Sequence, residues 1–443
     1  PLIVSSYYYH MNILGETELI RRFVFLGVVS MLLICCIPLA VLSESVNGTS
    51  SGISAPEESG DGEDGQSTPF SHAIMRPSAG ELVQWYDDYL NQDLVTEEIG
   101  IAELDETQTT GYVSLLGFID YNATERDQEQ CGNCWVWAST GVVEIAHTQQ
   151  NKVFDRLSIQ YVNSRYHNGG HSPFSPMHYA CNGGKVSDFV TFYNTIGKYG
   201  GNKMAVPWSN ENAEYQDGNS LDTTSVPADT IQTNPHYTLH QMSGQRIETF
   251  GVPQSVAIAN IKQVLNSGKG VYLSFAYPNN DGWQAFGTFW SGNSTEPITL
   301  DTYSGVEYGI TGGAHGVLVT GYYDDGMNGY WECLNSWGGP SNRPDGVFRV
   351  SLNMDYSSFY TVGDDIVPAM LWQTINVGYL GSEPATDPDK NIFNLTPDFI
   401  VSPVSGYSPL TVHFTDTSNG SPISWKWDFG DGAGSALRNP NHT

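Results

Sequence analysis

Residues 128–135 read Gln128-Glu-Gln-Cys-Gly-Asn-Cys-Trp135, and this is the most informative part of the sequence. Its second cysteine, Cys134, opens an apolar run with helical spacing that extends to His147. A cysteine at the first position of a helix lies at the positive end of the helix dipole, which lowers the pKa of its thiol. Because the thiolate is the reactive form, the sequence indicates that Cys134 is a nucleophile.

A thiol nucleophile needs a base that is distant in the sequence and close in space. His315 begins a strand-like run in Gly312-Gly-Ala-His-Gly-Val-Leu-Val-Thr-Gly321, and Asn335 ends the next one. Two adjacent antiparallel strands would bring His315 and Asn335 side by side, so that the amide orients the imidazole. The side-chain amide of Gln128 and the backbone N–H of Cys134 would then donate to a tetrahedral oxyanion.

These residues resemble the papain family of cysteine peptidases. The stretch Cys131-Gly-Asn-Cys-Trp135 resembles the Cys-Gly-Ser/Ala-Cys-Trp signature of that family, with Asn133 at the variable position. Gln128 stands six residues before Cys134, as the family's oxyanion glutamine does. Four further blocks follow in the family's order, and the resemblance covers residues 110–375: Leu157-Ser-Ile-Gln160, Cys181-Asn-Gly-Gly184, Asn335-Ser-Trp-Gly338 and Gly346-Val-Phe-Arg349.

The resemblance implies roles for further residues around the nucleophile. It pairs Cys131 with Cys181 in a disulfide and places Trp337 over the hydrogen bond between Asn335 and His315. Cys134, His315, Asn335 and Gln128 would be the catalytic residues, and the resemblance implies no metal ion and no cofactor.

The resemblance also implies a binding site for the substrate peptide. Gly183 and Gly184 would hold the substrate backbone. Lys185 stands among the family's specificity-pocket residues, where an apolar substrate side chain at the second subsite is usual. A lysine there argues against that usual preference.

The chain also departs from the family pattern. His315 lies 181 residues after Cys134 (315 − 134), beyond the usual separation of roughly 130–150. We expect the extra length in two polar stretches, 209–250 and 279–305, interpreted as surface insertions. Arg165 replaces the first partner of the family's second disulfide, so Cys333 is expected to be a buried free thiol; a second reactive site is the alternative.

The order of the patterns predicts an α+β domain over residues 110–380. Helical patterns at 135–147, 186–198 and 261–265 come first, and strand-like runs dominate afterwards. The family resemblance implies a papain-like fold of two lobes, a helical lobe and a β-barrel-like lobe.

The first 109 residues divide into two parts. Residues 1–43 hold an apolar run of 20 residues, 23–42, which is either a secretory signal cleaved after Ser43 or a retained membrane anchor. Residues 44–109 begin as an acidic, Gly-rich spacer that ends near residue 70. A helix is predicted over 78–92, and two interpretations remain open: a packed surface helix, or part of a propeptide that covers the active-site cleft.

The C-terminal part is a separate unit. A polar linker over 381–396 precedes residues 397–443, which resemble the polycystic kidney disease (PKD) repeat, an immunoglobulin-like β-sandwich. The chain stops about midway through such a repeat, so we expect an incomplete domain. The resemblance implies contact with a cell surface, a carbohydrate or a protein rather than chemistry.

The composition limits the partners. The chain has 443 residues and a net charge of -30, from 18 basic against 48 acidic residues. Nucleic acids and anionic membranes attract basic surfaces, so neither is expected to bind. Secretion or tethering at the cell surface is expected, because either interpretation of the apolar run at 23–42 places the bulk of the chain outside the cytoplasm, where a disulfide can persist.

Together these features predict a secreted or cell-surface cysteine endopeptidase that acts on proteins or peptides through an acyl-thioester on Cys134. Two alternatives remain open. The domain could be a catalytically silent surface adhesion or binding protein. It could also be an acyl-transfer enzyme that uses the same triad.

Overall fold

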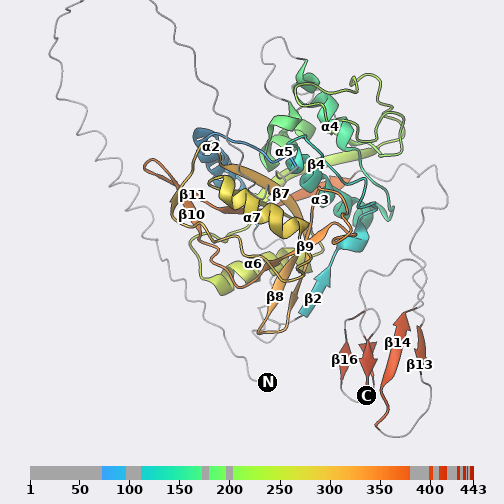
Figure 1. Ribbon diagram of the computed structural model, residues 1–443. Coiled ribbons are helices and arrows are strands. Elements are labelled where there is room, and N and C mark those ends of the chain that lie inside the picture. The colour runs from blue at the N-terminus through green and yellow to red at the C-terminus, as the bar shows by residue number, and fades with distance from the viewer. Residues whose placement is uncertain are drawn as a thin grey trace, which may run out of the picture. The chain divides into compact units, whose positions relative to one another are not determined.

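The computed structural model describes residues 72–95, 111–171, 179–195 and 203–379, together with short stretches between 399 and 443 (Figure 1). The expected signal or anchor (1–43), the acidic spacer (44–70) and the linker (381–396) lie outside the described residues. Across the described ranges, no helix combines the length and the apolar character that a membrane span requires.

The central helix begins at the predicted nucleophile. Helix α3 (Cys134–Asn151) is buried along almost its whole length, and it packs against strands of the main sheet and against helix α5 (Val186–Asn194). Such an all-round apolar helix belongs in the interior of a domain. The structure therefore confirms the helix predicted over 135–147 and extends it to Asn151.

Shorter helices surround α3 in the first half of the domain. Ser158 caps helix α4 (Ile159–Arg165) by accepting a hydrogen bond from the backbone N–H of Tyr161. Short 3-10 turns complete this helical region: η2 (Leu116–Phe118), η3 (Tyr166–Gly170) and η4 (Ala180–Asn182).

A nine-stranded sheet forms most of the second half. Its strands run in the order β1-β4-β12-β5-β7-β8-β9, with β2 paired to β7 and β3 paired to β4 (Figure 1). The strands are β1 (Asp93–Leu94), β2 (Gly111–Ser114), β3 (Met204–Ala205), β4 (Tyr237–Arg246), β5 (Val271–Tyr277), β7 (Gly313–Asp324), β8 (Gly329–Leu334), β9 (Val347–Ser351) and β12 (Met370–Tyr379). Helices precede most strands along the chain, so the α+β prediction is confirmed.

Two helices correct the sequence interpretation. The pattern at 261–265 is the end of a longer helix, α6 (Gln254–Asn266). The stretch 279–305, interpreted as a polar surface insertion, contains helix α7 (Asn280–Ser291), which buries Trp283, Phe286 and Trp290. The second expected insertion, 209–250, includes the sheet strand β4. Aromatic residues spaced three and four apart form a buried helical face even where Gln, Gly and Thr separate them.

The predicted N-terminal helix is also present. Helix α2 (Ala79–Leu90) starts with a capping box in which Ser78 and Glu81 exchange side-chain-to-backbone hydrogen bonds. It packs against a small sheet of order β11-β10-β6, formed by β11 (Asp365–Pro368), β10 (Phe359–Val362) and β6 (Val306–Glu307). Strand β1 then pairs in parallel with β4.

The C-terminal unit consists of short strands around aromatic side chains. Strand β14 (Val412–Asp416) pairs with β13 (Phe399–Ser402) and β17 (Asn441–His442), and β15 (Trp427–Asp428) pairs with β16 (Gly434–Ser435). The rings of Phe399, Phe414 and Trp427 lie 5.3–6.1 Å apart between centroids. This all-β character agrees with the prediction for residues 397–443.

Candidate active site

Cys134 lies in the core at the N-terminus of α3. Its side chain is completely buried, and its Sγ accepts a hydrogen bond of 3.3 Å from the backbone N–H of Gly316. Gly316 follows His315 on strand β7, so the sheet presents His315 beside the first turn of α3. The structure therefore brings together the nucleophile and the base that the sequence predicts 181 residues apart.

The hairpin of β7 and β8 aligns His315 with Asn335. The two strands pair antiparallel, with Leu318 opposite Leu334, and Asn335 directly follows the end of β8. His315 Nε2 lies 2.7 Å from Asn335 Oδ1. The other ring nitrogen, Nδ1, is buried and has no hydrogen-bond partner among the described residues. This is the nitrogen left available to exchange a proton with Cys134.

Aromatic rings enclose the imidazole of His315. Trp337 lies over it at 4.3 Å between ring centroids, and Phe275 meets it edge-on at 5.8 Å. Phe286 and Trp290 of α7 pack in turn against Trp337, at 5.5 and 5.8 Å. The helix that the sequence analysis missed thus supports Trp337, which lies where the family resemblance implies.

A network of hydrogen bonds fixes the amide of Gln128. Its Oε1 accepts a hydrogen bond of 2.7 Å from Ser336 Oγ, and its Nε2 donates to the backbone carbonyl of Cys131 at 2.7 Å. The same Nε2 donates to the carbonyl of Ala73 at 3.0 Å. Gln128 is completely buried, so its N–H donors point in one fixed direction.

The disulfide between Cys131 and Cys181 is present in the structure. It joins the loop before α3 to the turn that carries Gly183. The backbone of Gly132 approaches that turn so closely that a Cβ there would lie 2.5 Å from the carbonyl oxygen of Cys181. Gly132 is therefore required by the close approach of two backbones.

Gly183 and Gly184 form one wall next to the nucleophile. Gly183 has a φ of 102°, and a Cβ on Gly184 would lie 2.6 Å from the ring of Trp135. Both positions therefore favour glycine. Lys185 follows as the N-cap residue of α5, where its ammonium group forms ion pairs with Asp188 and Asp88.

Residues 72–77 run across the site between its two walls. Met75 exchanges two backbone hydrogen bonds of 3.0 Å with Ala314, the neighbour of His315. On the opposite wall, the Met75 side chain would lie 3.3 Å from a Cβ on Gly183. The backbone of Met75 also forms a hydrogen bond with the Cys134 thiol. This part of the chain covers the nucleophile.

Further contacts hold the same stretch in place. The ring of His72 stacks on Trp337 at 5.2 Å, so Trp337 contacts both His72 and His315. Arg76 donates to the carbonyl of Thr311 at 2.7 Å, and Tyr308 donates to the carbonyl of Pro77 at 3.1 Å. We call residues 72–95, which include α2 and β1, the occluding segment.

The covered site carries a neutral pair rather than an ion pair. Burial raises the pKa of the Cys134 thiol to about 12, although the backbone hydrogen bond from Gly316 lowers it. Burial lowers the pKa of His315 to about 3, against the opposing effect of Asn335. The sequence predicts a lowered thiol pKa from the helix start, but desolvation of the charged form outweighs that effect in the occluded structure.

Cys333 is the second free thiol among the described residues, and it is completely buried in β8. Burial raises its pKa well above the ordinary value. A thiol that stays protonated is a poor nucleophile, so the structure favours the structural role over a second reactive site. The described residues contain no cluster of three His, Cys, Asp or Glu residues that could hold a metal ion.

The sequence names the proposed catalytic and wall residues of the candidate site but not the supporting Ser336, Phe275 and α7, nor the occluding residues 72–77. Residues 72–77 precede the predicted helix and belong to no motif. Their contacts are mostly made by backbone atoms, which leave no pattern of side chains in the sequence. The only signal was the amphipathic helix at 78–92, for which covering of the cleft was one of two open interpretations.

Comparison with known families agrees with this geometry. The model of the papain family of cysteine proteases matches residues 121–362, and the model of the PKD domain matches residues 402–443. The first match includes Cys134, His315, Asn335 and Gln128.

Curated relatives and solved structures give more distant matches. Digestive cysteine proteinase 3 of Homarus americanus is 26% identical over 234 residues, or 52% of this chain and 58% of the relative. Cathepsin L of Sarcophaga peregrina is 26% identical over 223 residues, or 48% of this chain and 51% of the relative. The chain thus spans about half the length of the curated relatives it matches. The structure of procathepsin L2 from Tenebrio molitor larval midgut shares 15% identity at a TM-score of 0.41, covering 69% of this chain and 78% of that one.

Proposed function

The chain belongs to the papain family of cysteine proteases, and from this premise we propose that residues 110–380 act as a cysteine endopeptidase. The observation that carries the proposal is the buried hydrogen bond of 2.7 Å between His315 Nε2 and Asn335 Oδ1. It leaves Nδ1 of His315 for the thiol of Cys134. The substrates are proteins or peptides.

The proposed reaction begins with proton transfer from Cys134 Sγ to His315 Nδ1. The thiolate attacks the carbonyl carbon of a peptide bond, and the carbonyl oxygen becomes an oxyanion. The imidazolium then donates the proton to the departing amine, which leaves an acyl-thioester on Cys134. A water molecule, deprotonated by His315, hydrolyses the thioester and restores the thiol.

Three other residues prepare these steps. Gln128 Nε2 and the backbone N–H of Cys134 donate to the oxyanion as charge develops. Asn335 holds the imidazole in one orientation through its 2.7 Å contact with Nε2. Trp337 excludes water from that hydrogen bond, which strengthens it in the less polar surroundings.

We further propose that residues 44–109 contain a propeptide and that the occluding segment keeps the enzyme latent. Two features support this. The carbonyl of Ala73 takes the Nε2 donor of Gln128 that an oxyanion would need. The backbone of Met75 takes up both backbone hydrogen-bonding groups of Ala314 on one wall, and its side chain lies against Gly183 on the other. A substrate can reach Cys134 only after this segment moves away.

For the remaining domains, we propose that residues 1–43 direct the protein out of the cytoplasm and that residues 23–42 are either a cleaved signal or an anchor. The linker 381–396 then joins the peptidase to the PKD unit. That unit would contact proteins or carbohydrates at a cell surface. The Cys131–Cys181 disulfide supports an oxidising location.

The experiment that tests the proposed function is digestion of a peptide library. A recognition site for a site-specific protease would be introduced within residues 96–110 of the full chain. After cleavage by that protease, the occluding segment would be removed. We expect internal peptide bonds to be cut, which mass spectrometry of the products would record. A product pattern identical to that of the Cys134→Ala protein would refute the proposal.

Replacing Gln128 with alanine should reduce kcat by roughly 10²–10³-fold in the activated protein, with a smaller change in KM. The substitution removes an N–H donor that is used most strongly in the transition state. Steady-state kinetics on one peptide would measure both constants. Ser336→Ala is the matched control, because it removes the contact that orients Gln128 but leaves Nε2 in place. Equal losses in the two variants would contradict the oxyanion role.

A further inference from the structure

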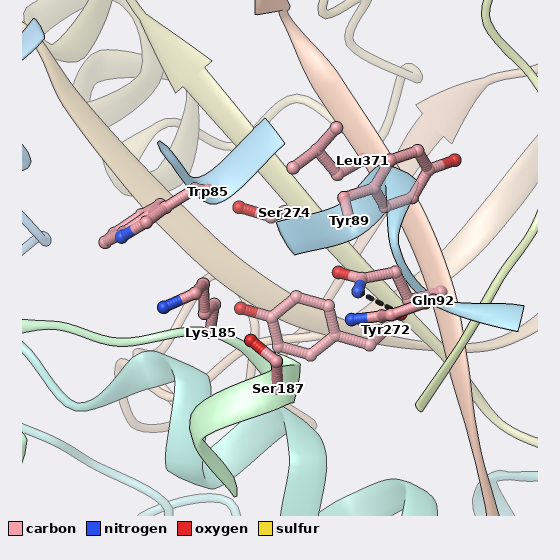
Figure 2. A pocket seen from close by; sticks show the side chains of 9 residues that line it. Trp85, Tyr89, Gln92, Lys185, Ser187, Tyr272, Ser274 and Leu371 are labelled. Carbon is pink, nitrogen blue, oxygen red and sulfur yellow. Dashed lines mark hydrogen bonds between the residues drawn. The ribbon is translucent and has the colours of Figure 1, made fainter. Parts of the chain in front are cut away.

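A cavity lies beside the active site between α2 and the body of the domain (Figure 2). The occluding segment supplies part of its wall through Trp85, Tyr89 and Gln92. The domain supplies the rest, from α5, β5 and β12: Lys185, Ser187, Tyr272, Ser274, Leu371 and Gln373. Departure of α2 would open this cavity into a pocket of the substrate groove.

The floor of the cavity is next to the nucleophile. The hydroxyl of Tyr272 would lie 2.7 Å from a Cβ on Gly316, whose N–H donates to Cys134 Sγ. At the rim, Lys185 directly follows Gly184 of the wall beside Cys134. A peptide that reaches Cys134 along this wall would therefore place one of its acyl-side side chains in the pocket.

Polar groups lie among apolar surface in the lining of this pocket. The domain contributes one ammonium group, three hydroxyl groups and one amide, together with the side chain of Leu371 and the ring of Tyr272. Gln373 Nε2 donates to Gln92 Oε1 at 2.7 Å, a partner that leaves with the occluding segment (Figure 2). An apolar side chain entering this pocket would leave such groups without partners, which costs free energy.

The ammonium group of Lys185 lies between two carboxylates. Asp188 belongs to the domain, whereas Asp88 belongs to the occluding segment and leaves with it. Lys185 Nζ lies 3.0 Å from Asp188 Oδ2 on its own helix and 3.1 Å from Asp88 Oδ2 on α2. Burial alone would lower the pKa of Lys185, but Asp188 and Asp88 outweigh it and raise the pKa, so the group is cationic. An ammonium group has three N–H donors, and loss of Asp88 frees one of them.

We propose that this pocket binds an acidic side chain of the substrate, whose carboxylate takes the place of Asp88 on Lys185. The inference rests on the proposed endopeptidase function and names its substrate class: peptides with Glu or Asp on the acyl side, at the residue that enters this pocket. The occluding segment uses the same contact to hold α2 over the site.

The nearby carboxylate of Asp188 limits the size of the effect. It neutralises part of the charge of Lys185, and the partial exposure of both groups screens the interaction further. We therefore expect a glutamate to be preferred by about tenfold over the isosteric glutamine, not by several orders of magnitude. The comparison of Glu with Gln separates charge recognition from polarity and size.

The test uses the full chain after removal of the occluding segment and a set of peptides that differ at each acyl-side position as Glu, Gln, Leu or Lys. We expect one position at which kcat/KM is about tenfold higher for Glu than for Gln, and higher for Gln than for Leu. In Lys185→Met the Glu-to-Gln ratio should fall to about one, and in Lys185→Glu the preference should shift to Lys. Lys203→Met, an exposed lysine outside the pocket, is the control and should keep the ratio.

The outcomes separate this inference from the proposed function. If no peptide is cut beyond the level of the Cys134→Ala protein, the endopeptidase proposal fails. If peptides are cut but Leu is favoured at every acyl-side position, or if the Glu preference survives in Lys185→Met, the assignment of this pocket is wrong. Because each variant is judged by a ratio of two substrates, a general loss of activity does not affect the result.

Discussion

Replacing Cys134 with alanine is expected to lower peptide hydrolysis by the activated protein by at least about 10⁴-fold. The sulfur forms the covalent bond of the proposed acyl-thioester, and the described residues offer no second exposed thiol, since Cys333 is completely buried. Alanine fills the same place at the start of α3 without strain, so the fold should persist. The measurement is kcat/KM on a peptide that the unmodified protein cuts.

Two controls make this result specific. Cys333→Ala removes the other free thiol and should leave the rate nearly unchanged, provided that the variant folds. A thiol-directed epoxide should label the activated protein and fail to label Cys134→Ala, as mass spectrometry would show. Hydrolysis that continues in Cys134→Ala, or epoxide labelling that depends on Cys333 instead, would contradict the proposed nucleophile.

The same pair of proteins distinguishes the alternative functions. A silent binding protein would bind peptides without a Cys134-dependent product. An acyl-transfer enzyme would form the same thioester but give a new amide when an amine acceptor is added. If the pocket and the glycine wall bind the acyl side of the substrate as proposed, both chemistries would select the same acyl group. Product analysis with and without an amine therefore decides between them.

The proposed catalytic residues could be placed together from the sequence because each belongs to a short stretch of unusual residues. Cys134 opens an apolar helix, and His315 and Asn335 lie on neighbouring strands, which fixes their proximity by the register of one hairpin. Strand pairing is a local rule, so the sequence suffices to place these side chains together. The disulfide between Cys131 and Cys181 follows from the family resemblance and is present in the structure.

The surroundings of these residues could not be predicted in the same way. Helix α7 was interpreted as polar because its aromatic residues are diluted by Gly, Asn and Thr, yet Phe286 and Trp290 support Trp337. The pKa of Cys134 depends on how deeply the thiol is buried, and the burial comes in part from Met75, a residue 59 positions earlier (134 − 75). Desolvation is a property of the assembled structure, so no local pattern reports it.

Release of the occluding segment is expected to raise the rate of peptide hydrolysis by at least about 100-fold. Ala73 and Met75 alone form four hydrogen bonds with the walls of the site. At about 0.5–1.5 kcal/mol each, these hold the closed form roughly 3 kcal/mol below the open one, which corresponds to an open fraction of about 1%. The measurement compares the intact chain with the chain cleaved within residues 96–110 and freed of the segment.

A substitution within the intact chain gives a matched control for that comparison. Met75→Pro removes the N–H that donates to Ala314 and should raise the rate about tenfold without any cleavage. Met75→Leu keeps the N–H and an apolar side chain of similar size, so it should stay latent. Equal rates for the two variants, or an intact chain as active as the cleaved one, would show that the segment does not control access.

The thiolate absorbance of Cys134, measured as the difference from the Cys134→Ala protein, should depend on pH differently before and after release of the occluding segment. In the occluded chain the thiol pKa of about 12 means that about one molecule in 10⁵ carries a thiolate at pH 7, so the thiolate absorbance should stay near zero at neutral pH and rise only at strongly alkaline pH. Release removes the burial that raises the thiol pKa and lowers that of His315. The thiolate and imidazolium can then coexist, and the thiolate absorbance should reach a plateau near neutral pH. An unchanged pH profile after release would show that burial by the segment does not hold the pair neutral.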